Sequence, residues 1–453
     1  GSTAWGVPRE AGGGGAGSVL GGGVGQPTSS EPIGLFTASY LFDATDITIG
    51  SAGFPYGLSF SRTYNSAMRN QHGPLGRGWR HNHQINASVD TSGMAGMGEQ
   101  TTIGAAGTIV EAFVAYDLQT DLTKPFDKYI TTALMNQWFI DNLFHNIVTI
   151  GSGFDSQTFV KLPDGTYANP ALDAGTLTVV GGLFVYTSLT GVKLNFNSFG
   201  HIATMVDPAG VTITYTYDSR ARLSTVSNGL GRTLTLTYGA DNMLDSVSDG
   251  TGRSVGYTID ASGNLVTVTD PNSKNWTYEY DIPGRMTKLF KPANPTVAIV
   301  TNTYDSLGRI KEQADYQSNV WQYFFAGSRT EEVNPNSKSS ILYFNNLGNT
   351  VKAINQVGKI SKATFDGRGR PIKNIAPEGN SVEFVYDSKN RVTQTTAKAK
   401  PASGLADIVS SATYDATWNK VKTTTDNMGR VTTMNYDVTN GNLLSLVSPS
   451  VTG

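Results

Sequence analysis

Few residues in this sequence have both the type and the spacing that chemistry requires. His81 and His83 stand one residue apart, which places two imidazoles on the same face of a predicted strand, and His72 precedes them. Imidazole nitrogens can ligate a metal ion. No carboxylate cluster accompanies these histidines, so we predict a hydrogen-bonded structural role for them and no metal site.

Carboxylates suggest calcium or paired acid–base chemistry as an alternative. Asp43, Asp46 and Asp90 are the candidates in the first part of the chain, whereas the aspartates that recur later are explained by turn formation. The sequence has no Gly-x-Ser-x-Gly elbow, and pairs such as Gly252-Arg253 are not followed by the Gly-Lys-Ser/Thr of a phosphate loop. We therefore predict that the protein is not an enzyme and binds no cofactor.

Aromatic side chains offer a third kind of site, because sugar rings stack on flat aromatic surfaces. The candidates are Tyr215, Trp276, Tyr278, Tyr280 and Trp321. They stand at positions that recur along the chain, which favours stacking between neighbouring strands. Binding of a surface glycan stays open as the alternative.

Composition excludes several classes of protein. The 453 residues include 34 Lys+Arg and 36 Asp+Glu, a net charge of −2, so we expect no nucleic-acid partner. No apolar run reaches the roughly 20 residues of a membrane span. Cysteine is absent, only 15% of residues are charged, and glycine contributes 51 residues. Abundant Gly, Thr, Ser and Asn with few charges favour a mainly β protein rich in tight turns.

The elements that must position these side chains fall into three segments. Residues 1–32 are rich in glycine and predict a flexible tail. Residues 33–154 predict a β domain, in which Leu58 to Tyr64 alternates with period 2 and residues 124–147 have the apolar spacing of an amphipathic helix that packs on a sheet. Residues 155–453 alternate between strand and turn patterns.

An internal repeat organises this last segment. An aromatic residue, replaced by isoleucine at 259, is followed by a turn block and recurs in steps of 21 residues, at 196, 217, 238, 259 and 280, again at 304 and 325, and again at 344, 365 and 386. Each unit has two strands and two turns, and one unit is too small to bury its own apolar face. The units therefore predict an array of hairpins that is stable only collectively.

The turn block Tyr-Asp-x-x-Gly-Arg has a physical logic. The carboxylate of Asp305 is suited to the first position of a type I turn, and Gly308 to the left-handed position that closes a three-residue hairpin. Stacked hairpins would bring the tyrosines together in cross-strand pairs. The residues that we assign to such turns are Tyr217, Asp218, Tyr280, Asp281, Gly284, Arg285, Tyr304, Asp305, Gly308, Arg309, Tyr386 and Asp387.

These tandem units resemble the YD repeats of Rhs and insecticidal toxin-complex proteins. An upstream motif resembles the N-terminal domain that precedes such repeats, in the residues Arg62, Tyr64, Asn65, Gly76, Gly78 and Trp79. The resemblance covers roughly residues 33–453. It implies a mainly β fold in which a ribbon of hairpins spirals into a shell or tube, with an N-terminal β cap that carries the helix around 124–147.

The resemblance also implies a function. Family members commonly use such shells to enclose a C-terminal toxin or to present a surface to other cells. This sequence has no Asp-Pro-x-Gly-Leu motif of the toxin members and ends at Val451-Thr452-Gly453 within repeat-like sequence. We expect a secreted or cell-surface structural protein that forms part of a shell, stalk or self-assembling fibre, with partners from the same assembly. The alternatives are the N-terminal part of a toxin-encapsulating shell and a carbohydrate-binding adhesin.

Overall fold

The computed structural model describes residues 28, 32–50, 55–97, 102–118, 124–169 and 175–449. Residues 1–27 and 29–31 of the predicted tail lie outside them. Two compact units divide the described chain: one combines the segment ending at His83 with the segment from Val206 onward, and the other is Gln84–Met205. These limits differ from the predicted division at residue 154. No helix in the described part has the length and hydropathy that crossing a bilayer requires.

The first unit opens with a segment that we call the leader, residues 32–83. It forms an antiparallel sheet in the order β1-β2-β3-β6. In β3 the residues Leu58, Phe60, Arg62 and Tyr64 are buried and alternate with partly exposed ones. The elements of the leader are β1 (Ile33–Gly34), β2 (Ser39–Ile49), β3 (Leu58–Asn65), the short 3-10 helix η1 (Ser66–Met68), β4 (His72–Gly73), β5 (Gly76–Arg77) and β6 (Trp79–His81).

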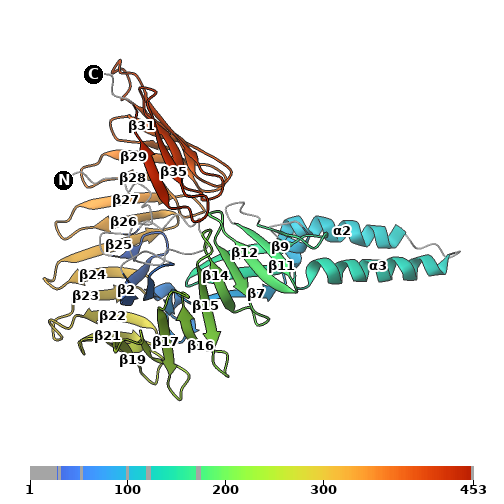
Figure 1. The fold of residues 1–453 in the computed structure, drawn as a ribbon, viewed down its shortest axis with the longest axis horizontal. Coiled ribbons are helices and arrows are strands. Elements are labelled where there is room, and N and C mark those ends of the chain that lie inside the picture. The colour runs from blue at the N-terminus through green and yellow to red at the C-terminus, as the bar shows by residue number, and fades with distance from the viewer. Residues whose placement is uncertain are drawn as a thin grey trace. The chain divides into compact units, whose positions relative to one another are not determined.

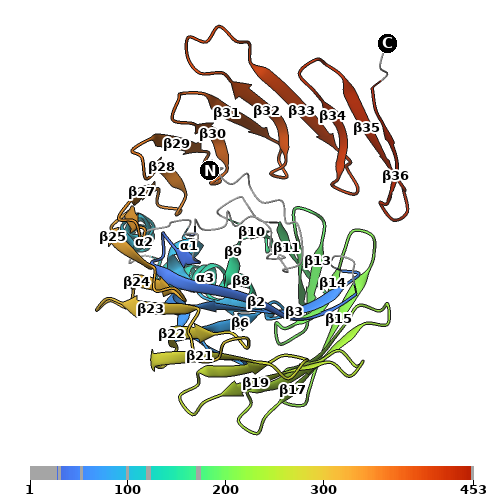
Figure 2. The same cartoon turned by 90° about the vertical axis from the view of Figure 1, so that its left-hand side faces the viewer.

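The strands β11 to β36 form one 26-stranded sheet in which neighbours in the chain are neighbours in the sheet, so the prediction of a mainly β hairpin array is confirmed. Within the first unit this ribbon curves around β2, β3 and β6 of the leader (Figure 2). Its strands here are β15 (Thr212–Tyr217), β16 (Leu223–Ser227), β17 (Thr233–Tyr238), β18 (Leu244–Ser248), β19 (Ser254–Ile259), β20 (Leu265–Thr269), β21 (Asn275–Ile282), β22 (Arg285–Phe290), β23 (Val300–Tyr304), β24 (Ile310–Asp315), β25 (Val320–Ala326), β26 (Arg329–Val333), β27 (Ser339–Phe344), β28 (Thr350–Ile354), β29 (Ile360–Phe365), β30 (Pro371–Ile375), β31 (Ser381–Tyr386), β32 (Val392–Lys398), β33 (Ile408–Tyr414), β34 (Val421–Thr425), β35 (Val431–Tyr436) and β36 (Leu443–Val447).

The second unit has a four-stranded sheet in the order β10-β9-β8-β7 and the first strands of the long ribbon. Its helices lie between β7 and β8, which pair directly, so they form an insertion in a β-hairpin. The elements are β7 (Ile85–Asp90), α1 (Gly93–Gly96), α2 (Thr102–Leu118), α3 (Pro125–Leu143), β8 (Ile147–Ser152), β9 (Asp155–Lys161), β10 (Tyr167–Ala168), β11 (Thr176–Val180), β12 (Leu183–Thr187), β13 (Lys193–Phe196) and β14 (Ile202–Val206).

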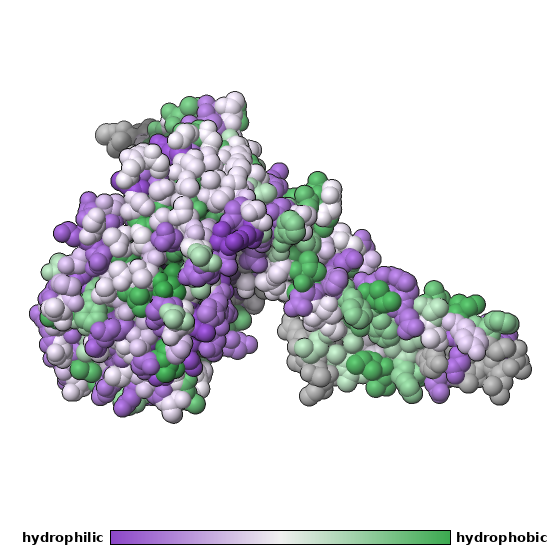
Figure 3. Space-filling view, turned by 90° about the horizontal axis from the view of Figure 1, so that it is seen from below, coloured by the Kyte–Doolittle hydropathy of each residue, from purple (hydrophilic) through white to green (hydrophobic). Residues whose placement is uncertain are grey.

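The predicted helix at 124–147 corresponds to α3, but its packing differs from the prediction. α3 contacts α1 and α2, and the two long helices extend side by side away from the strands of their unit (Figure 1). Phe126, Tyr129 and Leu134 are exposed over 76%, 73% and 66% of their surface, so the prediction of a helix packed on a sheet is wrong. Hydrophobic residues lie on the outer surface of these helices (Figure 3).

Candidate functional site: the leader core and the turn locks

The repeat turns are built around an aspartate carboxylate. In the turn at Asp305, Oδ1 accepts hydrogen bonds from the backbone N–H groups of Leu307 and Arg309, both at 2.9 Å, and Oδ2 accepts one from Arg309 Nε at 2.8 Å. Gly308 has a φ of 79° and donates its N–H to the Asp305 carbonyl at 3.0 Å. The positive φ is favourable for glycine, because a side chain would be strained there.

Further turns repeat this arrangement with their own aspartate and arginine. The i,i+4 ion pairs are Asp218–Arg222, Asp249–Arg253, Asp366–Arg370, Asp387–Arg391 and Asp426–Arg430. At Asp281 the turn is tighter, since Ile282 pairs with Arg285, but the carboxylate still accepts from Arg285 Nε at 2.8 Å and from Nη2 at 2.6 Å. Gly284 of this turn has a φ of 75°.

Hydrogen bonds keep these carboxylates ionised at neutral pH. The side-chain bond from Arg222 lowers the pKa of Asp218. At Asp249 burial opposes ionisation, but the bonds from Thr251 and Arg253 outweigh it and lower the pKa to about 2. A carboxylate held in this way is a poor proton donor or acceptor near pH 7, which fits a structural role for the turns.

Several of these turns are also fastened to the next repeat by an arginine–aromatic lock. The Arg222 guanidinium lies 4.6 Å from the centre of the Tyr238 ring, and the Tyr238 hydroxyl donates to the carbonyl of Leu223, the residue after that arginine, at 2.9 Å. Arg285 and Tyr304 form the same pair, with a 5.1 Å contact and a 2.6 Å bond from Tyr304 to the Met286 carbonyl.

The lock recurs in the later repeats. Arg370 lies over Tyr386 at 4.6 Å, and the Tyr386 hydroxyl donates to Pro371 at 2.8 Å; Arg391 and Tyr414 repeat this geometry at 4.4 Å. The sequence predicted that the tyrosines would pair with one another, whereas here the turn arginine is the ring's partner. The sequence did contain a signal for this contact, namely the arginine at the end of the turn, where the second strand of the hairpin begins.

The leader motif supplies a buried ion pair. Arg62 Nε lies 2.8 Å from Asp46 Oδ2, and the two side chains are only 2% and 5% exposed. The guanidinium lies over the rings of Trp79 and Tyr278 at 4.8 and 5.4 Å, and the Tyr257 hydroxyl donates to Asp46 at 2.8 Å. Burial disfavours the charge of Arg62, but the Asp46 carboxylate together with Tyr278 and Tyr257 outweighs burial and raises the pKa of Arg62.

Two aromatic residues of the leader bond directly to the repeats. The Tyr64 hydroxyl donates to the Gly284 carbonyl at 2.7 Å and accepts the N–H of Met286 at 2.9 Å. Trp79 Nε1 donates to the Tyr280 hydroxyl at 3.1 Å, and the Tyr64 and Trp79 rings lie 5.2 Å apart. The leader therefore occupies the inside of the curved ribbon and contacts its turns.

The remaining motif residues shape the leader backbone. Asn65 caps η1 by accepting the Ala67 N–H at 2.9 Å. Gly76 has a φ of 93°, and a Cβ there would lie 2.6 Å from the Gly263 carbonyl oxygen, so glycine permits the close approach of leader and repeat. Gly78, with a φ of 72°, lies against the Tyr64 ring.

Comparison with known proteins agrees with this geometry. A model of the teneurin YD-shell matches residues 180–294, and a model of a domain of unknown function, DUF6531, matches residues 30–103. The chain thus carries YD repeats that resemble those of the Rhs/YD-repeat family. No curated protein matches it.

Solved structures similar to this YD-repeat protein include toxin complexes. The crystal structure of TcdB2-TccC3 without its hypervariable C-terminal region aligns with a TM-score of 0.40 and 13% identity over 69% of this chain and 22% of that chain. The structure of the Photorhabdus luminescens Tc holotoxin pore aligns with a TM-score of 0.38 and 13% identity. This alignment covers 68% of this chain and 21% of that chain. The YD-repeat protein thus spans about a fifth of the length of these chains.

His81 and His83 are buried in the leader, whereas His72 is exposed. Burial lowers the pKa of His83 to about 4 and places that of His81 well below its ordinary value, so both imidazoles are neutral at pH 7. His83 Nε2 lies 2.9 Å from the Ser59 carbonyl. In the described part of the chain, no three His, Cys, Asp or Glu side chains come together to hold a metal ion. Asp46 is paired with Arg62, whereas Asp43 and Asp90 are exposed.

The aromatic residues considered for sugar stacking differ in exposure. Tyr215 and Tyr278 are 4% and 3% exposed, so the alternative of sugar stacking does not hold for these two side chains. Tyr280 donates to the Leu265 carbonyl and accepts from Trp79. Trp276 and Trp321 are half-buried.

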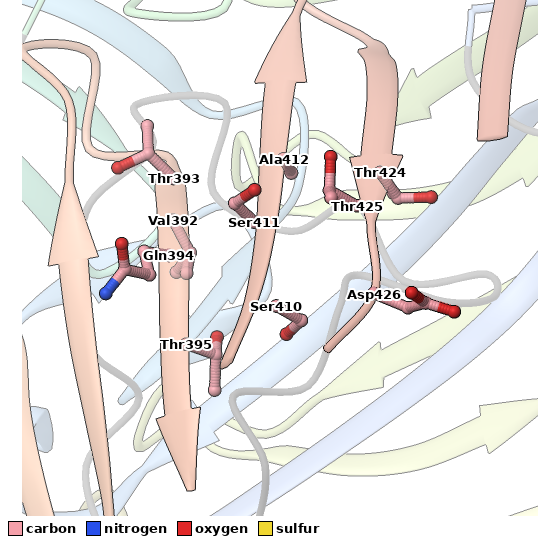
Figure 4. Close-up of a pocket in the computed structure, with 10 residues that line it drawn as sticks. All are labelled: Val392, Thr393, Gln394, Thr395, Ser410, Ser411, Ala412, Thr424, Thr425 and Asp426. Atoms are coloured by element: carbon pink, nitrogen blue, oxygen red, sulfur yellow. The ribbon is translucent and has the colours of Figure 1, made fainter. Parts of the chain in front are cut away.

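An open groove of about 270 Å³ crosses three neighbouring strands, β32 to β34 (Figure 4). Its one carboxylate, Asp426, accepts a 2.7 Å hydrogen bond from Arg430 Nε, so it is committed to a turn. Seven of the nine other lining residues have hydroxyl or amide side chains; the nine are Val392, Thr393, Gln394, Thr395, Ser410, Ser411, Ala412, Thr424 and Thr425. The groove offers hydrogen bonds but brings together no acid, base and nucleophile.

Proposed function

We propose that this chain is a structural component, a leader-filled section of the wall of an extracellular YD-repeat shell, and that it catalyses no reaction. The observation that carries the proposal is the bonding of the leader inside the ribbon through Tyr64, Trp79 and the Arg62–Asp46 pair. A filled and cross-bonded ribbon is suited to resisting proteases outside the cell.

The turn locks support a mechanical role. Neighbouring repeats are joined by backbone pairing, and several of them also by an arginine–aromatic contact and a tyrosine hydroxyl bond, as at Arg222 and Tyr238. Repeat arrays gain their stability from such contacts between neighbours. The wall is therefore expected to be continuous and to open cooperatively.

The partner in this proposal is another chain of the same assembly. In β36, the last described strand, Leu443, Leu444, Leu446 and Val447 are all more than half exposed. Within the described residues β36 pairs only with β35, so its other edge presents backbone groups to which a further strand can add. A net charge of −2 gives no reason to expect nucleic acid as the partner.

Enclosure of a toxin segment is the second candidate function; the match of residues 180–294 to a model described as a YD-shell supports an enclosing wall but does not identify what it encloses. The two candidates share the same wall and differ in whether the curved ribbon surrounds cargo. Expression with the downstream coding sequence, followed by a search for a protected fragment released on denaturation, distinguishes them.

Limited proteolysis of the full chain tests the wall. We expect a resistant fragment that contains leader and repeats, and a Trp79→Ala variant that loses this resistance. Trp138→Ala is the matched control, because Trp138 lies on α3, outside the leader and the repeats. Fractionation of the source cells tests location. Rapid digestion of the wild type to small peptides, or recovery only from the cytoplasm, contradicts the proposal.

A further inference from the structure

The two long helices of the second unit have their large apolar side chains on the outside. On α2 the least exposed positions with described side chains are Ala105, Thr108 and Ala112, all small, while Ile109 and Phe113 are 53% and 69% exposed. A helix that is apolar around most of its circumference is normally buried. The outer surface of α2 is therefore suited to being covered.

α3 has a continuous exposed apolar stripe. Phe126, Ile130, Leu134 and Trp138 follow one another at intervals of four residues, which places them on one face of the helix. All four are exposed by at least 41%. An i,i+4 stripe of this kind is the usual contact face between helices in a bundle.

The exposed apolar area is large enough for a stable protein interface. At about 100 Å² for each large, mostly exposed side chain, the two helices together offer about 1,000 Å², compared with about 800 Å² per partner in an ordinary stable complex. The ten side chains are Ile109, Val110, Phe113, Val114, Phe126, Tyr129, Ile130, Leu134, Trp138 and Ile140.

The charge of the helices favours a protein over a membrane as the occupant. Residues 102–143 include five acidic residues and two basic ones, Lys124 and Lys128. Helices that lie on membranes are usually rich in basic residues, which anionic lipids attract. An acidic hairpin is repelled by such a surface.

We propose that the α2–α3 hairpin is a self-association site that packs against the same hairpin of a second copy to form a four-helix bundle. A two-fold arrangement places each apolar stripe against an identical one, so one exposed face satisfies both chains. Two antiparallel helix pairs form the common up-down bundle. This site belongs to the second unit and does not rest on the proposed wall, which involves the leader and the ribbon.

Sedimentation of the full chain over a concentration series tests the proposal. We expect a dimer of twice the 48.3 kDa chain mass, and a Phe126→Asp/Leu134→Asp variant whose dissociation constant is raised at least roughly a hundredfold. Leu307→Asp is the matched control, because Leu307 is 74% exposed but lies in a repeat turn. A dimer that persists in the double variant overturns the proposal, as does a wild type that is monomeric at every concentration.

Cross-linking gives an independent measurement, since the sequence has no cysteine. Cysteines introduced one at a time at Phe126, Ile130 and Leu134 are expected to give a covalent dimer on oxidation at the position nearest the two-fold axis, and one at Leu307 is not. Co-sedimentation with vesicles of phosphatidylcholine and phosphatidylserine completes the test: vesicle binding without self-association overturns the proposal in favour of a lipid surface. A monomeric chain that keeps its protease resistance contradicts this site alone and leaves the proposed wall intact.

Discussion

Substitution of Tyr64 by phenylalanine gives the sharpest test of how the leader is held. The Tyr64 hydroxyl is buried and serves both the Gly284 carbonyl and the Met286 N–H, at 2.7 and 2.9 Å. Phenylalanine has nearly the same shape, so it opens no large cavity but leaves both backbone groups unpaired and buried. Because an unsatisfied buried group costs about 1–3 kcal/mol, we expect a loss of about 3 kcal/mol in the free energy of unfolding.

Tyr304→Phe is the matched control. The hydroxyl of Tyr304 donates to the Met286 carbonyl at 2.6 Å, and this bond belongs to a turn lock and not to the leader. We expect this variant to lose about 1 kcal/mol. Urea unfolding followed by tryptophan fluorescence measures both variants, because Trp79 lies beside Tyr64 and reports on the leader. The reasoning is refuted if Tyr64→Phe lowers the free energy of unfolding no more than Tyr304→Phe does, while the dependence of that free energy on urea concentration is unchanged.

Three further changes test the turns, the leader backbone and the buried histidine. Ala221 has a φ of 59° where other turns have glycine, so Ala221→Gly is expected to stabilise the protein by about 1 kcal/mol, seen as a higher midpoint of thermal unfolding. A lower midpoint of thermal unfolding would show that the ability of glycine to adopt a positive φ does not stabilise this turn. Gly76→Ala places a Cβ 2.6 Å from the Gly263 carbonyl oxygen at a residue with a φ of 93°. We expect the free energy of unfolding to fall by at least about 2 kcal/mol. An unchanged urea midpoint would contradict this expectation. Burial lowers the pKa of His83 to about 4, against about 6.5 in an unfolded chain, so the unfolded state takes up the proton first as pH falls. The contribution of neutral His83 to the free energy of unfolding, up to about 3 kcal/mol, is complete above about pH 6.5 and is lost as the pH falls toward 4. His83→Gln is therefore expected to weaken the dependence of the urea midpoint on pH between about pH 6.5 and about pH 4. An equal pH dependence in the wild type and the variant would contradict this prediction.

The fold could be predicted because its signal is local. A 21-residue step brings back turn formers such as Asp, Asn and Gly, usually after an aromatic residue, and these residues favour a hairpin without reference to the rest of the chain. The α2 helix was missed because glycine and alanine between residues 91 and 115 give no amphipathic pattern, and its exposed apolar face does not follow the usual rule of burial. The packing of α3 was predicted wrongly for the same reason.

The leader core could not be predicted from local pattern. Tyr64 and Gly284 stand 220 residues apart, and Trp79 and Tyr280 stand 201 apart, so no periodicity links them. The resemblance marked Arg62, Tyr64 and Trp79 as a motif but gave no partner for any of them. Asp46 was considered as a calcium ligand because a sequence does not show that an arginine sixteen residues later lies against its carboxylate.

The contact between Leu35 and Thr330 has a consequence for the order in which the chain can fold. The Thr330 hydroxyl donates to the Leu35 carbonyl at 2.6 Å, and 295 residues separate the two. At about 5–20 residues per second, a ribosome needs about 15–60 s to make that stretch, and throughout this time part of the leader's binding surface does not yet exist. Contacts of such long range also slow folding once synthesis is complete. The leader is thus the first of these segments to be made and among the last to be completed, and its buried charges and aromatic rings stay accessible to chaperones or export factors until the repeats have closed around them.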